Sequence, residues 1–316
     1  MTLSLRRVIN HLGRPPEWGV RRAVDHPIGP FTISAERISF SVMTHNMGLL
    51  VFPGNYLGTD RSGAISEIIA QIRSFRPDVV GLCEVFDNDE RERIRNALVE
   101  DYPFWRDGPD EDDLESDGGL LMLSRHPLLA AGQTIFRDSD GADSFANKGV
   151  IHVRIMPQPW PVPIDLFYSH MQDIETDDGV NTLYAQLSAM NLFIGERAEP
   201  NSPRFIFGDL NIPAEHAGHY HQLLSRLDQP VDCWTLAGNA VASGFTYDVD
   251  NNFYDEPEDR PNVGHRLDYL LLKARPAAVP IICDIDVLKF RRNGRNISDH
   301  FGLHAAFDHV AITSNG

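Results

Sequence analysis

Short apolar runs, each ending in a polar side chain, recur along the chain. The run at 205–207 passes through a glycine to Asp209 and Asn211, two positions apart. If the strand continues through them, side-chain alternation puts both residues on one face. There the carboxylate could hold a metal or a proton, and the amide could donate to a phosphate oxygen. A turn is the alternative, since Gly-Asp and Asn-Ile-Pro commonly end strands.

Further apolar runs along the chain end in the same way. They lead to His45 and Asn46, to Glu84, to His170, to Asp268, and to Asp299 and His300. Carboxylates, amides and histidines at successive strand ends are what a metal-assisted hydrolase needs at one edge of a sheet.

Periodic apolar positions predict helices between these strands. Isoleucines at 65, 68, 69 and 72 recur at helical spacing and are expected in the core. Further helices are predicted over 88–100 (with Ile94, Leu98 and Val99 facing inward), 180–198 and about 214–227. Alternating strands and helices argue for an α/β fold, and a hairpin within 151–168 makes the sheets mixed.

No internal repeat, linker or break in composition divides the chain. We therefore expect a single domain over 37–312, preceded by an N-terminal extension or edge strand within 1–36. At 316 residues, with 42% hydrophobic and 23% charged, this is the composition of an ordinary globular protein with a full core.

Two polar clusters have a structural alternative to a metal site. His216, His219 and His221 could bind zinc, but a solvated polar helix face is the favoured interpretation. The acid-rich run 107–117 is expected to be a solvated loop, because its spacing does not fit a calcium loop.

The compartment is inferred from what the N-terminus and the cysteines lack. Residues 1–20 contain no continuous apolar core or cleavage site, so no signal peptide is predicted, and no apolar stretch approaches the ~20 residues of a spanning helix. Three cysteines form no even-numbered disulfide framework. We expect a cytoplasmic protein, with secretion by another route left open.

The net charge of −17, from 28 basic and 45 acidic residues, bears on the partner. A non-specific nucleic-acid binder gains affinity from Lys and Arg, and an anionic membrane would repel this chain on average. A zwitterionic or small phosphorylated substrate is the easier partner, although a local basic patch could overrule the net charge. Nucleic acid is therefore the less expected partner, and the oligomeric state is left open.

Three segments carry a resemblance to a known family. They are Glu-Val-Phe-Asp-Asn at 84–88, Asp-Ser-Phe-Ala-Asn-Lys-Gly at 143–149 and Ser-His-Met-Gln at 169–172. Together with the strand ends, they resemble the endonuclease/exonuclease/phosphatase (DNase I-like) superfamily, and within it the neutral sphingomyelinase C branch. The resemblance covers roughly 38–307. It implies a four-layer α/β sandwich of two packed mixed sheets flanked by helices, with the site at one end.

Hydrolysis of a phosphodiester needs a metal, a base for water and donors to the developing oxyanion. Glu84, a carboxylate that ends an apolar strand, is the expected metal ligand, and Asn46 would assist the metal or the phosphate. Hard oxygen ligands favour Mg²⁺, with Mn²⁺ or Ca²⁺ as alternatives. The resemblance implies that Asp299 completes the metal region.

His300 is the candidate general base, because its ordinary pKa lies near neutrality. The resemblance implies Asp268 as the carboxylate that fixes its tautomer. His170 and Asn211 would donate to phosphate oxygens, while Asp209 would orient water or protonate the leaving oxygen.

Lys148 could reach the phosphate, with Asp143 controlling its position. A surface salt bridge between the two is the alternative.

The predicted function is a magnesium-dependent phosphodiester hydrolase of the sphingomyelinase C type, which releases a phosphorylated head group from sphingomyelin or a related (lyso)phospholipid. A nuclease or inositol-phosphate phosphatase of the same superfamily is one alternative, and a non-catalytic binding module on this fold is another. Secreted bacterial members of the branch carry an aromatic hairpin before the final Asp-His. This chain has Phe290 with Arg291 and Arg292 there, which predicts weak insertion into bilayers.

Overall fold

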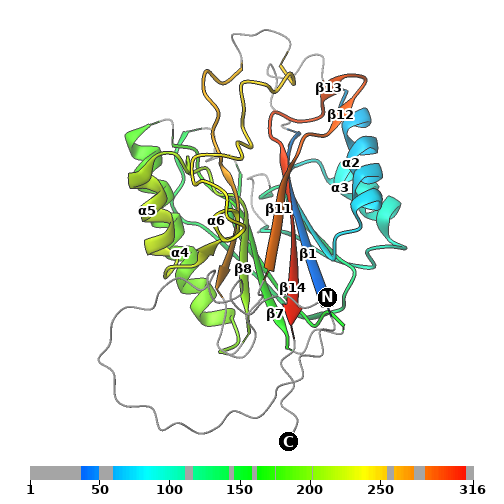
Figure 1. Cartoon of the computed structure of the whole chain (residues 1–316), viewed down its shortest axis with the longest axis horizontal. Helices are drawn as coiled ribbons and strands as arrows, with labels where there is room; N and C mark the ends of the chain where they lie inside the picture. The colour runs from blue at the N-terminus through cyan, green and yellow to red at the C-terminus, as the bar shows by residue number, and fades with distance from the viewer. Residues whose placement is uncertain are drawn as a thin grey trace, which may run out of the picture.

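The computed structural model describes residues 37–49, 60–110, 117–141, 146–158, 162–174, 176–200, 202–254, 260–273 and 282–310. Two six-stranded sheets pack face to face, with helices on both outer sides (Figure 1). The predicted four-layer α/β sandwich of mixed sheets is confirmed. The predicted edge strand at 31–34 and Asp143 lie outside the described residues.

The first sheet has the strand order β11-β14-β1-β2-β4-β3. Its strands are β1 (Arg37–Leu49), β2 (Val79–Val85), β3 (Phe104–Gly108), β4 (Leu120–Ser124), β11 (Ile282–Leu288) and β14 (Gly302–Val310). Because β1 runs parallel to β2 and antiparallel to β14, the strand ends of β1 and β2 lie beside the start of β14.

The second sheet has the order β5-β6-β7-β8-β10-β9. Its strands are β5 (Leu128–Ile135), β6 (Gly149–Ile155), β7 (Ile164–His170), β8 (Arg204–Asp209), β9 (Val231–Asp232) and β10 (Asp268–Lys273). β6 and β7 form the predicted hairpin. β7 and β8 are parallel and place His170 opposite Asp209, while antiparallel β10 places Asp268 opposite Asp209.

Aromatic rings fill the space between the two sheets. Phe40 of the first sheet lies 5.5 Å from Phe205 of the second, measured between ring centroids. Gly81 faces the ring of Tyr168, where an added Cβ would come within 2.5 Å of a ring carbon. A glycine at this position therefore lets the two sheets approach each other.

Two helices cover the first sheet: α2 (Arg61–Phe75) and α3 (Asn88–Leu98). The four isoleucines of α2 are buried, as their spacing predicts. Ile94 and Leu98 of α3 are also buried, but Val99 is 46% exposed, so its predicted inward orientation is wrong. The helix ends at Leu98, and Val99 is its C-cap.

The outer face of the second sheet is covered by α4 (Asp177–Arg197) and α5 (Ala217–Arg226), on the opposite side of the molecule (Figure 1). The short α6 (Cys233–Leu236) instead packs Cys233 and Trp234 into the core between the two sheets. Within the described parts of the chain, no helix is long and apolar enough to span a bilayer. A small hairpin of β12 (Arg291–Arg292) and β13 (Arg295–Asn296) lies near α2 at one end of the sandwich (Figure 1).

Candidate active site

The predicted strand-end residues meet at one end of the sandwich. Asn46 and Glu84 come from the first sheet, and His170, Asp209 and Asp268 come from the second. Asp299 and His300 immediately precede β14. The site therefore spans the ends of both sheets, rather than the single sheet edge that strand patterns suggest.

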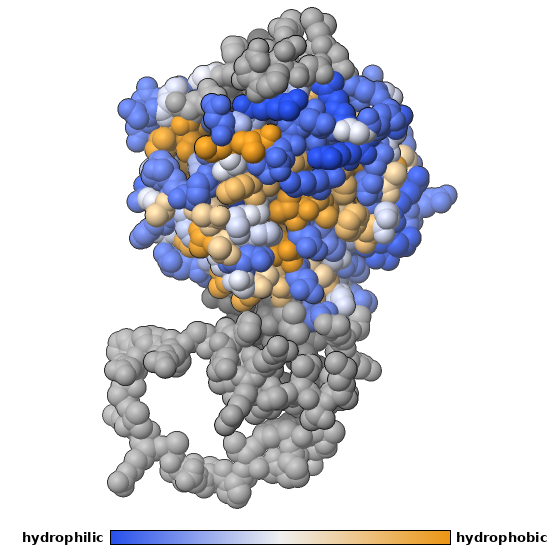
Figure 2. All heavy atoms as spheres, turned by 45° about the horizontal axis from the view of Figure 1, so that its top comes forward, coloured by the Kyte–Doolittle hydropathy of each residue, from blue (hydrophilic) through white to orange (hydrophobic). Residues whose placement is uncertain are grey.

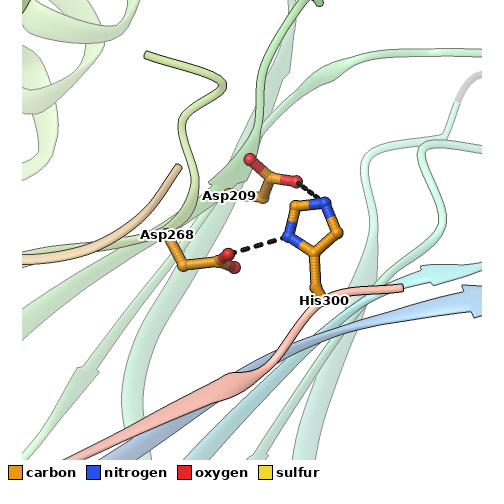
Figure 3. A group of neighbouring side chains, drawn as sticks. All are labelled: Asp209, Asp268 and His300. Carbon is orange, nitrogen blue, oxygen red and sulfur yellow. Dashed lines mark hydrogen bonds and ion pairs between the residues drawn. The ribbon is translucent and has the colours of Figure 1, made fainter. Parts of the chain in front are cut away.

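A histidine between two carboxylates forms the centre of the site (Figure 3). His300 Nδ1 lies 2.9 Å from Asp268 Oδ2, and its Nε2 lies 3.7 Å from Asp209 Oδ2. All three side chains are buried. The Asp268 contact fixes the Nδ1 side of the ring and directs Nε2 toward Asp209.

Burial opposes a positive charge on His300, but the carboxylates of Asp209 and Asp268 outweigh it. They hold the pKa of His300 well above its ordinary value. The backbone around Asp268 is held by Thr246, whose Oγ1 accepts hydrogen bonds from the amides of Leu267 and Asp268, each at 3.1 Å. The His–Asp pair is thus built into rigid, buried structure.

Asn46 joins the two halves of the site. Its Nδ2 donates to Glu84 Oε1 and to Asp209 Oδ2, both at 2.9 Å, while its Oδ1 accepts from the amide of Gly48 at 3.0 Å. The amide nitrogen, and not the oxygen that a metal would prefer, therefore faces the carboxylates. Asn46 spaces two negative groups that would otherwise repel each other.

Glu84 is held in an unusual backbone conformation, with φ of 55°. Non-glycine residues at positive φ are uncommon, and they cluster where function fixes the geometry. Burial raises the pKa of Glu84 to about 7, and the negative charge of Asp299 adds to this. Burial also raises the pKa of Asp209, to about 6.

The donor set fits a hard divalent cation. Glu84, Asp209, Asp268 and Asp299 place an excess of carboxylate oxygen in a small, largely buried volume, which explains the upward pKa shifts. A cation held by Glu84 and Asp299 would offset that charge, and oxygen ligands favour Mg²⁺. Donor atoms of Asp209, Asp268 and His300 also lie within 4.8 Å of one another, so this group could hold an ion as well.

His170 and Lys148 form a second buried pair. Lys148 Nζ lies 3.2 Å from His170 Nε2 and donates to the carbonyl of Met171 at 2.8 Å. Because an ammonium can only donate, Nε2 accepts and the ring proton lies on Nδ1, which is buried without a hydrogen-bond partner in the described structure. Burial lowers the pKa of His170 well below its usual value, and the charge of Lys148 acts in the same direction.

The segment after β8 is a turn, and the predicted alternation of Asp209 and Asn211 is wrong. β8 ends at Asp209, and Asn211 has a φ of 51°. The amide of Asn211 donates to Asp209 Oδ1 at 3.0 Å, and its side chain donates to the Met171 carbonyl at 2.8 Å. The turn still brings Asn211 to the site, by a different geometry from the one predicted.

Three residues that the sequence did not single out hold Asp299 in place. Tyr254 donates its hydroxyl to Asp299 Oδ2 at 2.8 Å, and Asn251 Nδ2 donates to the Asp299 carbonyl at 2.8 Å. Ser298 Oγ lies 3.2 Å from Asp299 Oδ1 and also donates to the Asn46 carbonyl at 2.6 Å. Asn251 and Tyr254 lie in the long polar loop before Asp268, and no periodic pattern marks them.

Three further histidines, at 126, 216 and 219, have structural contacts. His126 Nε2 lies 2.9 Å from Asp78 Oδ1 at a turn. His216 caps α5 by accepting from the amide of His219, whose ring contacts the Tyr184 hydroxyl at 2.6 Å. These contacts agree with the polar-face interpretation of the histidine cluster.

The two packed sheets carry buried carboxylates and histidines at one end. The model of the endonuclease/exonuclease/phosphatase family matches residues 43–300, so the chain belongs to this family.

Curated relatives place the chain near the sphingomyelinase C branch, as predicted. Sphingomyelinase C 2 of Leptospira interrogans is 26% identical over 276 residues, which cover 80% of this chain but 42% of that protein. A sphingomyelinase C of Bacillus cereus is 28% identical over 276 residues, with 76% of this chain and 77% of that protein covered. The chain thus spans about two fifths of the length of its leptospiral relative.

Solved structures share the fold. Sphingomyelinase C from Streptomyces griseocarneus superposes with a TM-score of 0.69 at 21% identity, covering 85% of this chain and 99% of that one. A mutant of Staphylococcus aureus beta toxin with bound magnesium ions has a TM-score of 0.69 at 17% identity, with 85% and 99% covered. D. rerio TDP2 complexed with a single-strand DNA product has a TM-score of 0.66 at 17% identity, with 85% and 98% covered.

Proposed function

We propose that this protein is a magnesium-dependent phosphodiester hydrolase of the sphingomyelinase C type, which releases a phosphorylated head group from sphingomyelin or a related (lyso)phospholipid. The buried Asp268–His300 pair next to Asp209 carries the proposal, because it supplies a base whose Nδ1 is held by Asp268 and whose Nε2 faces Asp209 at 3.7 Å. The curated relatives named sphingomyelinase C support the substrate class.

In the proposed reaction, a water oxygen bonds to phosphorus and the phosphorus–oxygen bond to the lipid alcohol breaks. A cation held by Glu84 and Asp299 would lower the pKa of His300, because it would offset carboxylate charge that raises this pKa. Neutral His300 Nε2 then accepts the proton from water, while Asp268 holds Nδ1 and stabilises the resulting imidazolium. Asp209, whose pKa burial raises to about 6, orients the water or protonates the leaving oxygen. The products are the lipid alcohol and a phosphomonoester head group.

His170, Lys148 and Asn211 would stabilise the charge that develops on the phosphoryl oxygens. The Nε2 atom of His170 faces the site, 3.8 Å from Glu84 Oε1 and from Asp209 Oδ2, so this nitrogen would donate to a phosphoryl oxygen in the form of the ring that carries a proton there. A bound Mg²⁺, held by Glu84 and Asp299 with Asn46 beside them, would supply charge neutralisation at the phosphate.

A single phospholipid head group suits the charge of this chain better than a polyanion does. With a net charge of −17, the protein would repel the phosphates of DNA electrostatically, whereas a single head group carries little charge.

A substrate panel tests the proposal directly. Purified protein is assayed with and without Mg²⁺ on detergent-dispersed sphingomyelin, lysophosphatidylcholine, plasmid DNA and inositol phosphates. We expect Mg²⁺-dependent release of a phosphorylated head group from a lipid at a rate above plasmid nicking. Rapid plasmid cleavage with no head-group release from either lipid would replace this function with a nuclease.

A further inference from the structure

Two buried glutamines lie in and beside the segment that follows His170. Gln172 is 4% exposed, and Gln186 of α4 is 1% exposed. Hydrophilic side chains dominate the surface of the upper part of the molecule, outside the grey segments (Figure 2), so most polar groups there lie in water. A carboxamide taken out of water is unfavourable unless its oxygen and its nitrogen both form hydrogen bonds. The partners of these two amides therefore show what the glutamines do.

Gln186 lies on the apolar inner face of α4, one turn from Leu183 and from Met190. Its Oε1 accepts from the amide of Gln172 at 2.9 Å, and its Nε2 donates to the Asp138 carbonyl at 2.9 Å. Both ends of the buried amide are thus satisfied. The side chain joins the segment that follows β7 to the segment that follows β5.

Gln172 joins the same two segments a second time. Its Oε1 accepts from the amide of Asp140 at 2.9 Å, and its Nε2 donates to the carbonyl of the same residue at 3.2 Å. Thr176, the N-cap of α4, donates to Asp140 Oδ2 at 2.9 Å. Residues 138–140 are therefore fixed against Gln172 and against the start of α4.

These two segments also hold Lys148. The amide of Phe136, which follows β5, donates to the Lys148 carbonyl at 2.8 Å. Lys148 Nζ donates to the carbonyl of Met171, which follows β7, also at 2.8 Å. The backbone of Lys148 is thus attached to one segment and its ammonium to the other. Because the two glutamines tie the segments together, the hydrogen bonds close into a ring that passes through Lys148.

We propose that Gln172 and Gln186 are positioning residues, which fix the Lys148 ammonium against the phosphate in the candidate active site. The inference rests on the hydrolase function proposed above, in which Lys148 stabilises charge on the phosphoryl oxygens. Such stabilisation requires donors that are held in place before the reaction. A displacement of about 1 Å can cost roughly 100-fold in rate, and the ring resists it at both ends of the lysine.

Phosphorothioate substrates separate a positioning role from a purely structural one. The substrates are a p-nitrophenyl phosphodiester and its two phosphorothioate stereoisomers, in which sulfur replaces one or the other non-bridging oxygen. Sulfur accepts weaker hydrogen bonds than oxygen, so the stereoisomer with sulfur toward Lys148 should be cleaved more slowly than the oxygen ester. A variant that only lowers the amount of folded enzyme reduces all three rates by the same factor.

Gln172→Met and Gln186→Met keep the length of the side chain and remove its amide. We expect each to lower kcat for the oxygen ester by about 10- to 100-fold. Each should also reduce the oxygen-to-sulfur rate ratio at least about threefold for one stereoisomer and leave it unchanged for the other, because one donor has lost its fixed position.

Tyr102→Phe is the matched control. The buried Tyr102 hydroxyl donates to the Pro77 carbonyl at 2.7 Å, before the start of β2 and at the far end of that strand from Glu84. The variant loses a buried hydrogen bond to a carbonyl and should lower the thermal midpoint, but it should keep both rate ratios. Wild-type ratios in both glutamine variants, or the same change in Tyr102→Phe, would overturn the positioning role and leave the hydrolase function intact.

If the wild type cleaves none of these esters, the hydrolase function fails and the ring is judged by hydrogen exchange. The Phe136 amide is hydrogen-bonded to Lys148 and not to either glutamine, so it reports on the ring at a distance. Its exchange, followed by NMR, should be about tenfold or more faster in Gln172→Met and in Gln186→Met, and unchanged in Tyr102→Phe. Wild-type exchange at Phe136 in both glutamine variants would show that they do not hold Lys148.

Discussion

Lys148 and Asn211 donate to the same acceptor, the carbonyl oxygen of Met171, each at 2.8 Å. This carbonyl immediately follows His170, whose Nε2 also contacts Lys148. One backbone segment therefore positions three side chains proposed to face the phosphate. The Ser-His-Met-Gln segment at 169–172 thus supplies His170 and also positions Lys148 and Asn211 through the Met171 carbonyl.

The shared acceptor gives a prediction for Asn211. Asn211→Gly retains the positive φ of 51° without strain and removes only the side-chain donor. Lys148 continues to satisfy the Met171 carbonyl, so the fold should persist. We expect kcat to fall roughly 100-fold, the usual effect of losing one oxyanion donor. Steady-state kinetics and circular dichroism check this, and an unchanged kcat would remove Asn211 from the mechanism.

Glu84→Gln is expected to abolish metal-dependent turnover while the protein remains folded. Burial and the charge of Asp299 raise the pKa of Glu84 to about 7, which means that its negative charge is unfavourable when no cation is present. The neutral amide should therefore leave the thermal midpoint in chelator unchanged or higher. Activity titrations with Mg²⁺ and melting curves in EDTA measure the two effects.

Full turnover of the wild type in chelator would contradict a metal role for Glu84. So would a Glu84→Gln variant that melts well below the wild type in EDTA, because this would make Glu84 a structural group.

Much of the site could be predicted from the sequence because it lies at the ends of apolar runs. Asp268 and His300 were identified in this way, and the structure brings them within hydrogen-bonding distance. Asn251 and Tyr254 could not be found, because they act across more than 40 positions on Asp299 and follow no periodic pattern. Local alternation failed at Asn211, because β8 ends at Asp209 and Asn211 lies in the following turn with a positive φ.

Arg266 is predicted to be a stability residue, two positions before Asp268. Its guanidinium is 1% exposed, pairs with buried Asp232 at 2.7 Å, and stacks on Tyr269 at 4.7 Å from the ring centroid. Arg266→Met leaves Asp232 buried without its cation, so we expect a loss of about 3–5 kcal/mol in the free energy of unfolding. Urea denaturation measures this loss. Arg125→Met, which removes a part-exposed arginine, is the control and should cost less than about 1 kcal/mol.

Asp165 should make the folded state sensitive to acid. Burial of Asp165 opposes its charge, but hydrogen bonds from His152, the Glu199 amide and Arg154 outweigh it and hold its pKa below the ordinary value. A carboxyl with a lowered folded-state pKa stabilises the protein above its unfolded pKa of about 3.9, and this stabilisation is lost as pH falls through the folded pKa.

Asp165→Asn should therefore reduce the free energy of unfolding at neutral pH and flatten its dependence on pH below about 4. Denaturation curves at a series of pH values compare the variant with the wild type. Parallel curves through the acid range would show that Asp165 has the same pKa in both states.

The Asp268–His300 pair should act as one catalytic unit. Asp268 Oδ2 contacts His300 Nδ1 at 2.9 Å and has no other route to the reacting phosphate in the proposed mechanism. We expect His300→Ala to lower kcat by about 10²–10⁴-fold, and Asp268→Asn to lower it substantially by leaving the ring without its orienting acceptor. The double variant should then be no slower than His300→Ala alone, because groups that act together are not additive.

Asp165→Asn, which removes another buried carboxylate at the opposite end of β7, is the control and should leave kcat near the wild-type value under conditions where it is folded. Single-turnover rates on one p-nitrophenyl phosphodiester compare the four variants with the wild type. If the effects of Asp268→Asn and His300→Ala multiply in the double variant, Asp268 serves the reaction independently of His300 and the orienting role is wrong.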